Sequence, residues 1–288
     1  MRSGLALLAA VVVVVACSEK QVAQSVPANA NRIVSLAPNL TELVYTVGAG
    51  GQLVGVSAWS DYPRAVLDLP VVGDAFTVDQ EQLALAKPDL LLVWESGTPT
   101  HIVDELREIG YNVVSITTRE LDDVAEALLQ IGELTGHVDK AAEAAAMYRG
   151  ELQSLRDRYQ SLPPIRVFYQ VAARPLYTIN NEHYISELIS VCGGDNIFKD
   201  LSELAPTVDV EAVVDRDPEV MLASTDAGDD AFVEWQRWPG MAANKSGNLF
   251  LLPADEIGRA TTRVIVAGNA MCVALQQARI NRASAAQE

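Results

Sequence analysis

Two segments of the chain share one pattern of hydrophobic and polar positions. Residues 78–93 (VDQEQLALAKPDLLLV) and 208–223 (VDVEAVVDRDPEVMLA) both read Val-Asp-x-Glu, a helically spaced stretch, proline before an acidic residue, and four apolar residues. Asp79 and Asp209 are typical helix N-cap residues, and proline cannot continue a helix, so each copy predicts a short capped helix and a turn. The apolar run that ends each copy is typical of a parallel strand covered on both faces. An offset of about 130 positions is a domain length, so the pattern predicts two similar lobes around a cleft.

Strands and helices alternate along the rest of the chain, as parallel βαβ units require. We expect strands at 32–36, 53–57, 90–93, 113–116, 166–170, 220–223 and 248–252, and helices at 40–47, 101–109, 184–191 and 263–277. Residues 121–134 and 138–161 are rich in Ala, Leu, Glu and Arg and contain no proline, which predicts a long helical connection. The predicted fold class is α/β: two similar Rossmann-like lobes with central parallel-rich sheets, joined by a long helix, with the ligand cleft between them.

The same pattern sets the expected domain boundaries. The N-terminal α/β lobe is expected at 32–120, the connecting helices at 121–162, and the C-terminal α/β lobe at 163–280. Residues 281–288 are expected to form a flexible tail. A helical connector would resist the wide hinge opening that extended linkers allow.

The first residues have the layout of an export signal. Arg2 precedes an apolar segment at 5–15 that is too short to span a bilayer. The segment ends in VVAC, which is similar to the bacterial lipobox, where cleavage precedes a cysteine that then carries lipid. We interpret 1–16 as a signal peptide, Cys17 as the lipidation site and 17–31 as a lipidated tether. Ordinary secretion, with Cys17 incidental, is the alternative.

Two further cysteines remain in the exported chain. Disulfides are permitted in an exported protein, and a bridge between Cys192 and Cys272 is the economical pairing. Two buried, unpaired thiols are the alternative, because a sequence separation does not establish proximity.

Composition and charge exclude several kinds of partner. The chain has 288 residues, of which 49% are hydrophobic, enough for two domains with proper cores. Its formal net charge of -17, with no basic cluster, would repel phosphate backbones. Nucleic acid is therefore not expected as a partner.

Signatures of enzymes and metal sites are missing from the sequence. The histidines, His101, His137 and His183, lack the short spacing of metal ligands. There is no P-loop, and the segment GVSAW at 55–59 fails the nucleophile-elbow pattern at its last position. We therefore expect no catalytic residue, no metal site and no cofactor.

Aromatic residues fall where α/β proteins bind ligands. Trp59 and Trp94 each follow a predicted strand, and Trp235 lies in a loop-rich part of the second half. Three other aromatic residues lie after strands or in loops: Tyr62, Phe76 and Tyr177. Core packing is the alternative for any one of them. Together they favour a large, flat, mostly apolar ligand clamped between the lobes.

A polar pair could complete such a site. Arg259 and the nearby Asp255 could hydrogen-bond the polar edges of the ligand. An exposed ion pair is the alternative.

Four motifs carry a family resemblance. They are RIVSLAPNLTEL at 32–43, SDYP at 60–63, KPDL at 87–90 and VCGGDNIF at 191–198. In order and approximate spacing they resemble the periplasmic vitamin B12-binding proteins of ABC importers, which belong to the helical-backbone class of substrate-binding proteins. The resemblance runs from about Arg32 to Gln277. Ferric-siderophore and haem binders share several of these motifs, so a binding protein of an iron importer is the first alternative. An α/β enzyme or a ligand sensor is the alternative from a different class.

The resemblance implies a corrinoid in the cleft. Trp59, Trp94, Tyr177 and Trp235 fall at or near aromatic positions of the family's pocket, and Asp255 with Arg259 matches a polar pair there. Two segments depart from the family's pattern: Ala75-Phe76, where a tryptophan can stand, and Val171-Ala172, where an aromatic residue would be expected.

The resemblance also implies partners. Glu81 and Glu211 match two surface carboxylates that dock onto arginines of the permease, although glutamates in a first helical turn also complement the helix dipole. Cys192 and Cys272 match a disulfide of the family. The implied protein is a monomeric solute-binding lipoprotein of the periplasm or cell surface, held to a membrane by its lipid. It would capture cobalamin and deliver it to an ABC permease dimer with its ATPase.

Overall fold

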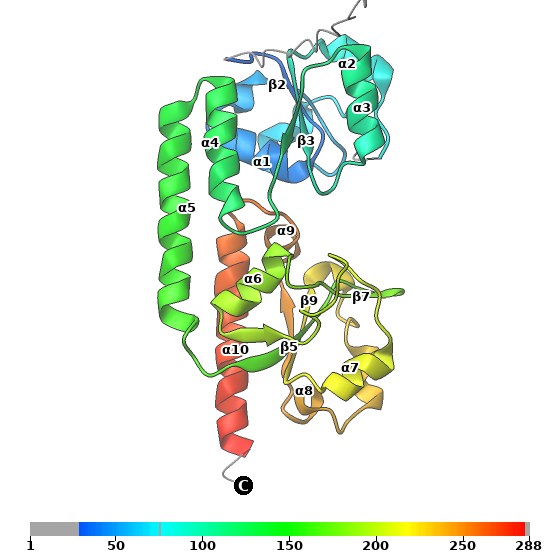
Figure 1. Ribbon diagram of the computed structural model, residues 1–288, viewed down its shortest axis with the longest axis vertical. Helices are drawn as coiled ribbons and strands as arrows, with labels where there is room; N and C mark the ends of the chain where they lie inside the picture. Colours follow the sequence, from blue (N-terminus) through cyan, green and yellow to red (C-terminus); the bar gives the residue numbers. More distant parts are fainter. Residues whose placement is uncertain (1–28, 75, 286–288) are drawn as a thin grey trace, which may run out of the picture.

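The structure is a computed structural model that describes residues 29–74 and 76–285. Two α/β lobes lie one above the other, with a long helix running beside them (Figure 1). The expected signal peptide at 1–16 and the lipidation site at Cys17 lie outside the described residues. Within the described ranges, none of the helices combines the length and apolarity that crossing a bilayer requires.

The N-terminal lobe is built on a parallel sheet with the strand order β2-β1-β3-β4. Its strands are β1 (Ile33–Ser35), β2 (Leu53–Val56), β3 (Leu90–Trp94) and β4 (Val113–Ile116), and its helices are α1 (Pro38–Thr46), α2 (Gln80–Ala86) and α3 (Thr100–Ile109), with short 3-10 turns η1 (Gly50–Gln52) and η2 (Arg64–Asp68). Each predicted strand is present, within one or two residues at its ends.

Both faces of this sheet are covered, which explains the unbroken apolar run of β3. Ile33 and Leu90 pack on one face with apolar residues of α1 and of α4 (Asp123–Thr135). Val34 and Leu91 pack on the other face with Leu83 of α2. Because neither face meets water, there is no polar alternation to read in the sequence.

The C-terminal lobe repeats the architecture with the order β10-β9-β5-β8, again all parallel. Its strands are β5 (Ile165–Gln170), β8 (Gly194–Asn196), β9 (Val220–Ser224) and β10 (Leu249–Leu252), with a small hairpin of β6 (Ala172–Ala173) and β7 (Leu176–Tyr177). Its helices are α6 (Tyr184–Val191), α7 (Val210–Arg216), α8 (Ala242–Lys245), α9 (Ala254–Ile257) and α10 (Val264–Ala285), with 3-10 turns η3 (Thr225–Ala227) and η4 (Val233–Arg237). In both lobes the first strand lies between the second and the third, so the duplicated sequence corresponds to a duplicated topology.

The duplicated helices end in the same way. Lys87 and Asp217 follow α2 and α7 in the left-handed conformation, with φ of 46° and 41°. The guanidinium group of Arg32 donates from Nε to the carbonyl of Lys87 at 3.0 Å, and that of Arg166 donates from Nε to the carbonyl of Asp217 at 3.1 Å. Each arginine therefore satisfies a carbonyl that the helix end leaves free. The two arginines are not separated by the offset of the repeat, so a comparison at fixed offset does not pair them.

A carboxylate completes each of these turns. Asp89 accepts a hydrogen bond from the backbone N–H of Arg32 at 3.0 Å, and Glu219 accepts one from that of Arg166 at 3.0 Å. The start of the duplicated helices is less symmetric. Asp79 caps α2 by accepting from two backbone N–H groups, whereas Asp209 stands at the cap position of α7 without a side-chain hydrogen bond.

Helices join the lobes as predicted. α4 and α5 (Val138–Tyr159) form an antiparallel pair, and α5 runs beside both lobes in Figure 1. The last helix, α10, extends to Ala285 instead of ending at 277, so residues 281–285, expected to belong to a flexible tail, continue the helix. Arg279 is one reason, because its guanidinium group donates to the carbonyls of Cys192 and Gly193, each at 2.8 Å.

The expected disulfide is present. Cys192, at the end of α6, is bonded to Cys272 in α10, and both are fully buried. The bridge joins the end of α6 to the long C-terminal helix.

Candidate ligand-binding site

A cavity of about 760 Å³ lies at the carboxyl ends of strands from both lobes. Trp94, the last residue of β3, borders it from the N-terminal lobe, and Gln170 and Ser224, the last residues of β5 and β9, border it from the C-terminal lobe. Open parallel sheets bind ligands at this edge. The volume is within the range of about 300–1,000 Å³ that is typical of small-molecule sites.

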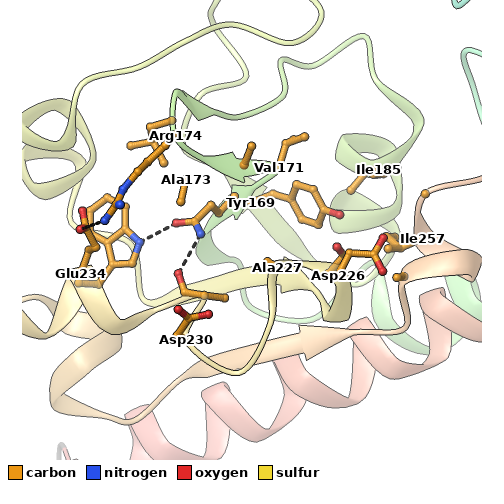
Figure 2. Close-up of a pocket in the computed structure, with 18 of the residues that line it drawn as sticks. Tyr169, Val171, Ala173, Arg174, Ile185, Asp226, Ala227, Asp230, Glu234 and Ile257 are labelled. Carbon is orange, nitrogen blue, oxygen red and sulfur yellow. Dashed lines mark hydrogen bonds and ion pairs between the residues drawn. The ribbon is translucent and has the colours of Figure 1, made fainter.

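One wall of the cavity is a fixed aromatic surface. The Trp235 indole Nε1 donates to the Gln170 side-chain carbonyl at 2.7 Å, and the Gln170 amide donates to the carbonyl of Ala231 at 2.9 Å; both bonds are drawn as dashed lines in Figure 2. The Trp235 ring also packs edge-on against Phe168, with ring centroids 5.6 Å apart. Its polar atom is satisfied and its ring is held on two sides, so the wall is formed before any ligand arrives.

Trp94 borders the cavity from the other lobe, and its indole differs from that of Trp235 in its hydrogen bonding. Its indole Nε1 is buried and has no hydrogen-bond partner among the described residues. The ring rests on Gly97, where an added Cβ would lie 2.0 Å from Cε3 of Trp94. The glycine therefore makes room for the indole, and the indole retains an unused donor.

The second lobe contributes acidic side chains to the cavity wall. Asp226 and Asp230 lie below Tyr169 in Figure 2 and have no ion-pair partner in the described part of the chain. A third carboxylate, Glu234, is paired with Arg174. Burial, together with the charge of Asp226, raises the pKa of Tyr169, so its hydroxyl stays protonated. The wall therefore carries a net negative charge.

His183 adds a neutral imidazole to the same wall. It is the N-cap of α6, where its Nδ1 accepts a hydrogen bond from the backbone N–H of Ile185 at 3.2 Å. Burial lowers its pKa to about 4. At neutral pH the ring is therefore uncharged.

Beside the cavity, a buried carboxylate of the first lobe holds the second lobe. Glu42 of α1 is only 3% exposed, and its carboxylate accepts from Arg259 at 2.9 Å, from Arg263 at 3.1 Å and from the Thr261 hydroxyl at 3.1 Å. Burial raises the pKa of Glu42, and the two guanidinium groups oppose that shift. The three partners belong to the segment between α9 and α10, so this cluster joins the lobes.

Arg259 is the centre of a wider set of contacts. Besides Glu42, it pairs with Asp61 at 2.6 Å and with Asp255 at 3.4 Å, and its Nη2 donates to the carbonyl of Trp59 at 3.2 Å. The predicted pair of Asp255 and Arg259 therefore exists, and Arg259 is mostly buried between the lobes. It is neither an exposed ion pair nor a free donor at the cavity.

The expected aromatic residues are divided between two places. Trp94 and Trp235 line the cavity. Trp59, Tyr62 and Phe76 lie on first-lobe loops and are 82%, 49% and 71% exposed. The guanidinium group of Arg263 stacks 4.1 Å from the centre of the Tyr62 ring, so Tyr62 belongs to the contact between the lobes. Tyr177 is half-buried in β7, opposite Ala172, which lines the cavity.

Trp59 has an unusual backbone. Its φ of 68° lies in the left-handed region, which a bulky side chain rarely adopts. Backbone strain of this kind costs on the order of 1–3 kcal/mol and is concentrated at binding sites. The Arg259 hydrogen bond to the carbonyl of Trp59 helps to hold this conformation.

Sequence reasoning missed several lining residues. Gln170, His183, Asp226 and Asp230 border the cavity but belong to no recognised motif. Gln170 is the last residue of β5, and Asp226 lies two residues after the end of β9. The end-of-strand rule that selected the tryptophans could therefore also have found them. The described residues contain no group of three or more His, Cys, Asp and Glu side chains arranged to hold a metal ion.

Residues 33–256 match the periplasmic binding protein family. The chain belongs to this family. A vitamin B12-binding protein of Vibrio cholerae serotype O1 is 35% identical to it over 251 residues, which cover 87% of this chain and 91% of the relative.

Solved structures of the family have the same fold. The crystal structure of the periplasmic vitamin B12 binding protein BtuF of Vibrio cholerae matches with a TM-score of 0.81 at 35% identity, covering 88% of this chain and 99% of that one. The periplasmic haem-binding protein RhuT of Roseiflexus matches with a TM-score of 0.76 at 20% identity, covering 87% and 99%, and shows the fold alone. The two-lobed α/β prediction is confirmed. The relatives are periplasmic substrate-binding proteins rather than enzymes, which also confirms the expected non-catalytic class.

Removing the shared carboxylate should destabilise the protein. Glu42→Ala leaves Arg259 and Arg263 partly buried without their partner, so we expect the free energy of unfolding to fall by about 3 kcal/mol. Urea denaturation followed by circular dichroism measures this. The matched control is Glu126→Ala, which breaks an exposed pair with Arg149 and should have little effect. Equal losses for the two variants would contradict the role assigned to Glu42.

Proposed function

We propose that the protein captures cobalamin or a related corrinoid in the cavity between its lobes and delivers it to an ABC importer. The observation that carries the proposal is the pair of tryptophans, Trp94 and Trp235, that border one cavity from opposite lobes. A corrin macrocycle is large, flat and mostly apolar, and burying it against such walls would supply most of the binding free energy. The similarity to proteins named as vitamin B12-binding supports the same ligand class.

The charge of the cavity favours a corrinoid over the alternatives. Haem carries two carboxylates at its edge, and Asp226 and Asp230 would repel them. Cobalamin carries primary amides around its ring, whose N–H groups can donate to those carboxylates. A ferric-siderophore or haem binder is thus the second candidate; the shared fold favours it, and the acidic wall opposes haem.

The exposed aromatic residues of the first lobe support a cover over the ligand. Trp59 has an exposed ring and a strained backbone, and its backbone carbonyl accepts a hydrogen bond from Arg259 of the other lobe. An unpaired aromatic ring of this kind is suited to packing on a ligand that fills the cleft. Phe76 and Tyr62, on neighbouring loops, extend the apolar surface.

A ligand panel tests the proposed function. Cyanocobalamin should quench the intrinsic fluorescence and bind with sub-micromolar affinity, a free energy of about -8 kcal/mol or stronger, with calorimetry as the check. Haemin should bind more weakly because its carboxylates would meet the acidic wall, and a ferric hydroxamate because it lacks a flat macrocycle to pack against the tryptophans. The double variant Asp226→Asn with Asp230→Asn should reduce the difference in affinity between cyanocobalamin and haemin, because it removes the carboxylates that repel haemin. A clear response to haemin or the ferric hydroxamate with none to cyanocobalamin would refute the corrinoid assignment.

Glu81 and Glu211 are proposed to dock onto the permease. Both are exposed in the first turns of α2 and α7, and among the described residues neither carboxylate joins an ion pair. The two helices lie on the same side of the molecule, away from α5, in Figure 1. A permease of two identical subunits would present two equivalent surfaces, which a duplicated protein can meet together.

Replacing both glutamates should separate binding from transport. Glu81→Ala with Glu211→Ala should leave cyanocobalamin affinity unchanged and reduce uptake about tenfold or more, because charged contacts with the permease are lost. Uptake of labelled cobalamin by cells lacking their own binding protein measures this. Glu143→Ala with Glu151→Ala, on the exposed face of α5, is the control and should leave uptake intact. Wild-type uptake by the Glu81 and Glu211 variant would remove the docking role.

The proposed lipid anchor at Cys17 has its own test. Cys17→Ser should abolish labelling with a radioactive fatty acid and move the protein from the membrane fraction to the soluble periplasmic fraction, since the acyl chains provide the attachment. Fractionation of expressing cells measures both. A soluble, unlabelled wild-type protein would instead support ordinary secretion.

A further inference from the structure

His183 occupies two structurally important positions at once. It is the N-cap of α6, and it also lines the ligand cavity. We propose that His183 donates a hydrogen bond from Nε2 to an uncharged acceptor on the bound corrinoid and does not ligate its cobalt. This inference rests on the proposed function, because it concerns the ligand of the same cavity.

The helix cap fixes which ring nitrogen carries the proton. Nδ1 accepts the backbone N–H of Ile185 at 3.2 Å, so Nδ1 must offer a lone pair. In a neutral imidazole the proton is then on Nε2. Burial lowers the pKa of His183 to about 4, so the neutral form, with this single tautomer, persists at neutral pH.

The donor is available to a ligand. Nε2 has no acceptor among the described residues, and it is not one of the buried polar atoms that lack a partner. It is therefore accessible, on a residue of the cavity wall. The ring is also held in place: it stacks on Tyr184 with centroids 4.6 Å apart, and the Tyr184 hydroxyl donates to the carbonyl of Ile257, another lining residue, at 2.7 Å.

This tautomer is incompatible with metal ligation. A histidine that binds a metal through Nε2 needs the lone pair there and a proton on Nδ1. Moving the proton to Nδ1 would set it against the Ile185 N–H and remove the cap of α6. Cobalt is therefore left to ligands other than this side chain, and His183 acts as a positioned donor.

The acceptor that fits is an amide carbonyl. A ring edged with amide carbonyls could accept from Nε2 of His183, whereas a purely apolar ligand would leave that donor unsatisfied. The His183 donor would thus contribute to selecting amide-bearing corrinoids.

Two variants separate the cap from the donor. H183N keeps a good N-cap acceptor but is too short to replace the Nε2 donor, so it should retain the wild-type Tm and bind cyanocobalamin about 5- to 10-fold more weakly. H183Q carries an amide N–H with longer reach and should bind more tightly than H183N. Affinities come from calorimetry and Tm from circular dichroism.

Absorption spectroscopy tests the ligation half of the proposal. Aquacobalamin changes its visible spectrum when imidazole replaces the bound water. Because His183 is proposed not to ligate the cobalt, the spectrum should stay unchanged on binding to the wild-type protein. A spectral shift with wild type that is absent with H183N would overturn the proposal, as would wild-type affinity in a folded H183N or weaker binding by H183Q than by H183N. If the wild-type protein binds no corrinoid at all, the proposed function fails first, and this inference fails with it.

Discussion

The arrangement of the lobes depends on the ion pairs that the buried carboxylate of Glu42 makes across them. A carboxylate that is 3% exposed must find cations, and here both come from the other lobe, Arg259 and Arg263. Because these arginines flank the segment that leads into α10, the ion cluster and the long helices constrain the same pair of lobes from two sides. The cavity next to the cluster therefore has walls whose separation is set before binding, as expected for a protein with a helical connection rather than a flexible hinge.

In the duplicated fold, the amino-terminal and carboxyl-terminal ends of the strands have different roles. At the amino-terminal end, Arg32 and Arg166 close the turns after α2 and α7 by bonding their last carbonyls. These contacts recur in both lobes and serve the fold. At the carboxyl-terminal end the equivalent strands differ: β3 ends in Trp94 whereas β9 ends in Ser224, and β1 ends in Ser35 whereas β5 ends in Gln170, which accepts from Trp235. The symmetry is thus retained in the turns that follow the duplicated helices and broken at the strand ends that border the cavity.

What could be predicted from the sequence was encoded locally. Proline after each duplicated helix and unbroken apolar runs located β3 and β9, and all other predicted strands and helices exist. The end of α10 was placed too early, although residues 278–285 (ARINRASA) contain no Gly or Pro and include good helix formers; Arg279 also anchors this part of the helix by bonding the carbonyls of Cys192 and Gly193. The role of Arg259 was equally hidden, since its partner Glu42 lies 217 positions away. His183 was judged only by its spacing to other histidines, which does not reveal a cap at the edge of a cavity.

Fold alone does not decide the ligand, because haem-binding relatives have the same architecture. On the proposed function, the apolar area of the cavity walls and the charged groups of the cavity have different effects on binding. The tryptophan walls would bind any flat macrocycle, so they contribute affinity with little discrimination. Discrimination requires groups that one ligand satisfies and another leaves unpaired. Asp226 and Asp230 oppose a carboxylate edge, and the proposed N–H donor of His183 favours a carbonyl acceptor. An amide-rimmed edge meets both conditions, so on the proposed function this combination, rather than the number of aromatic residues, would favour a corrinoid.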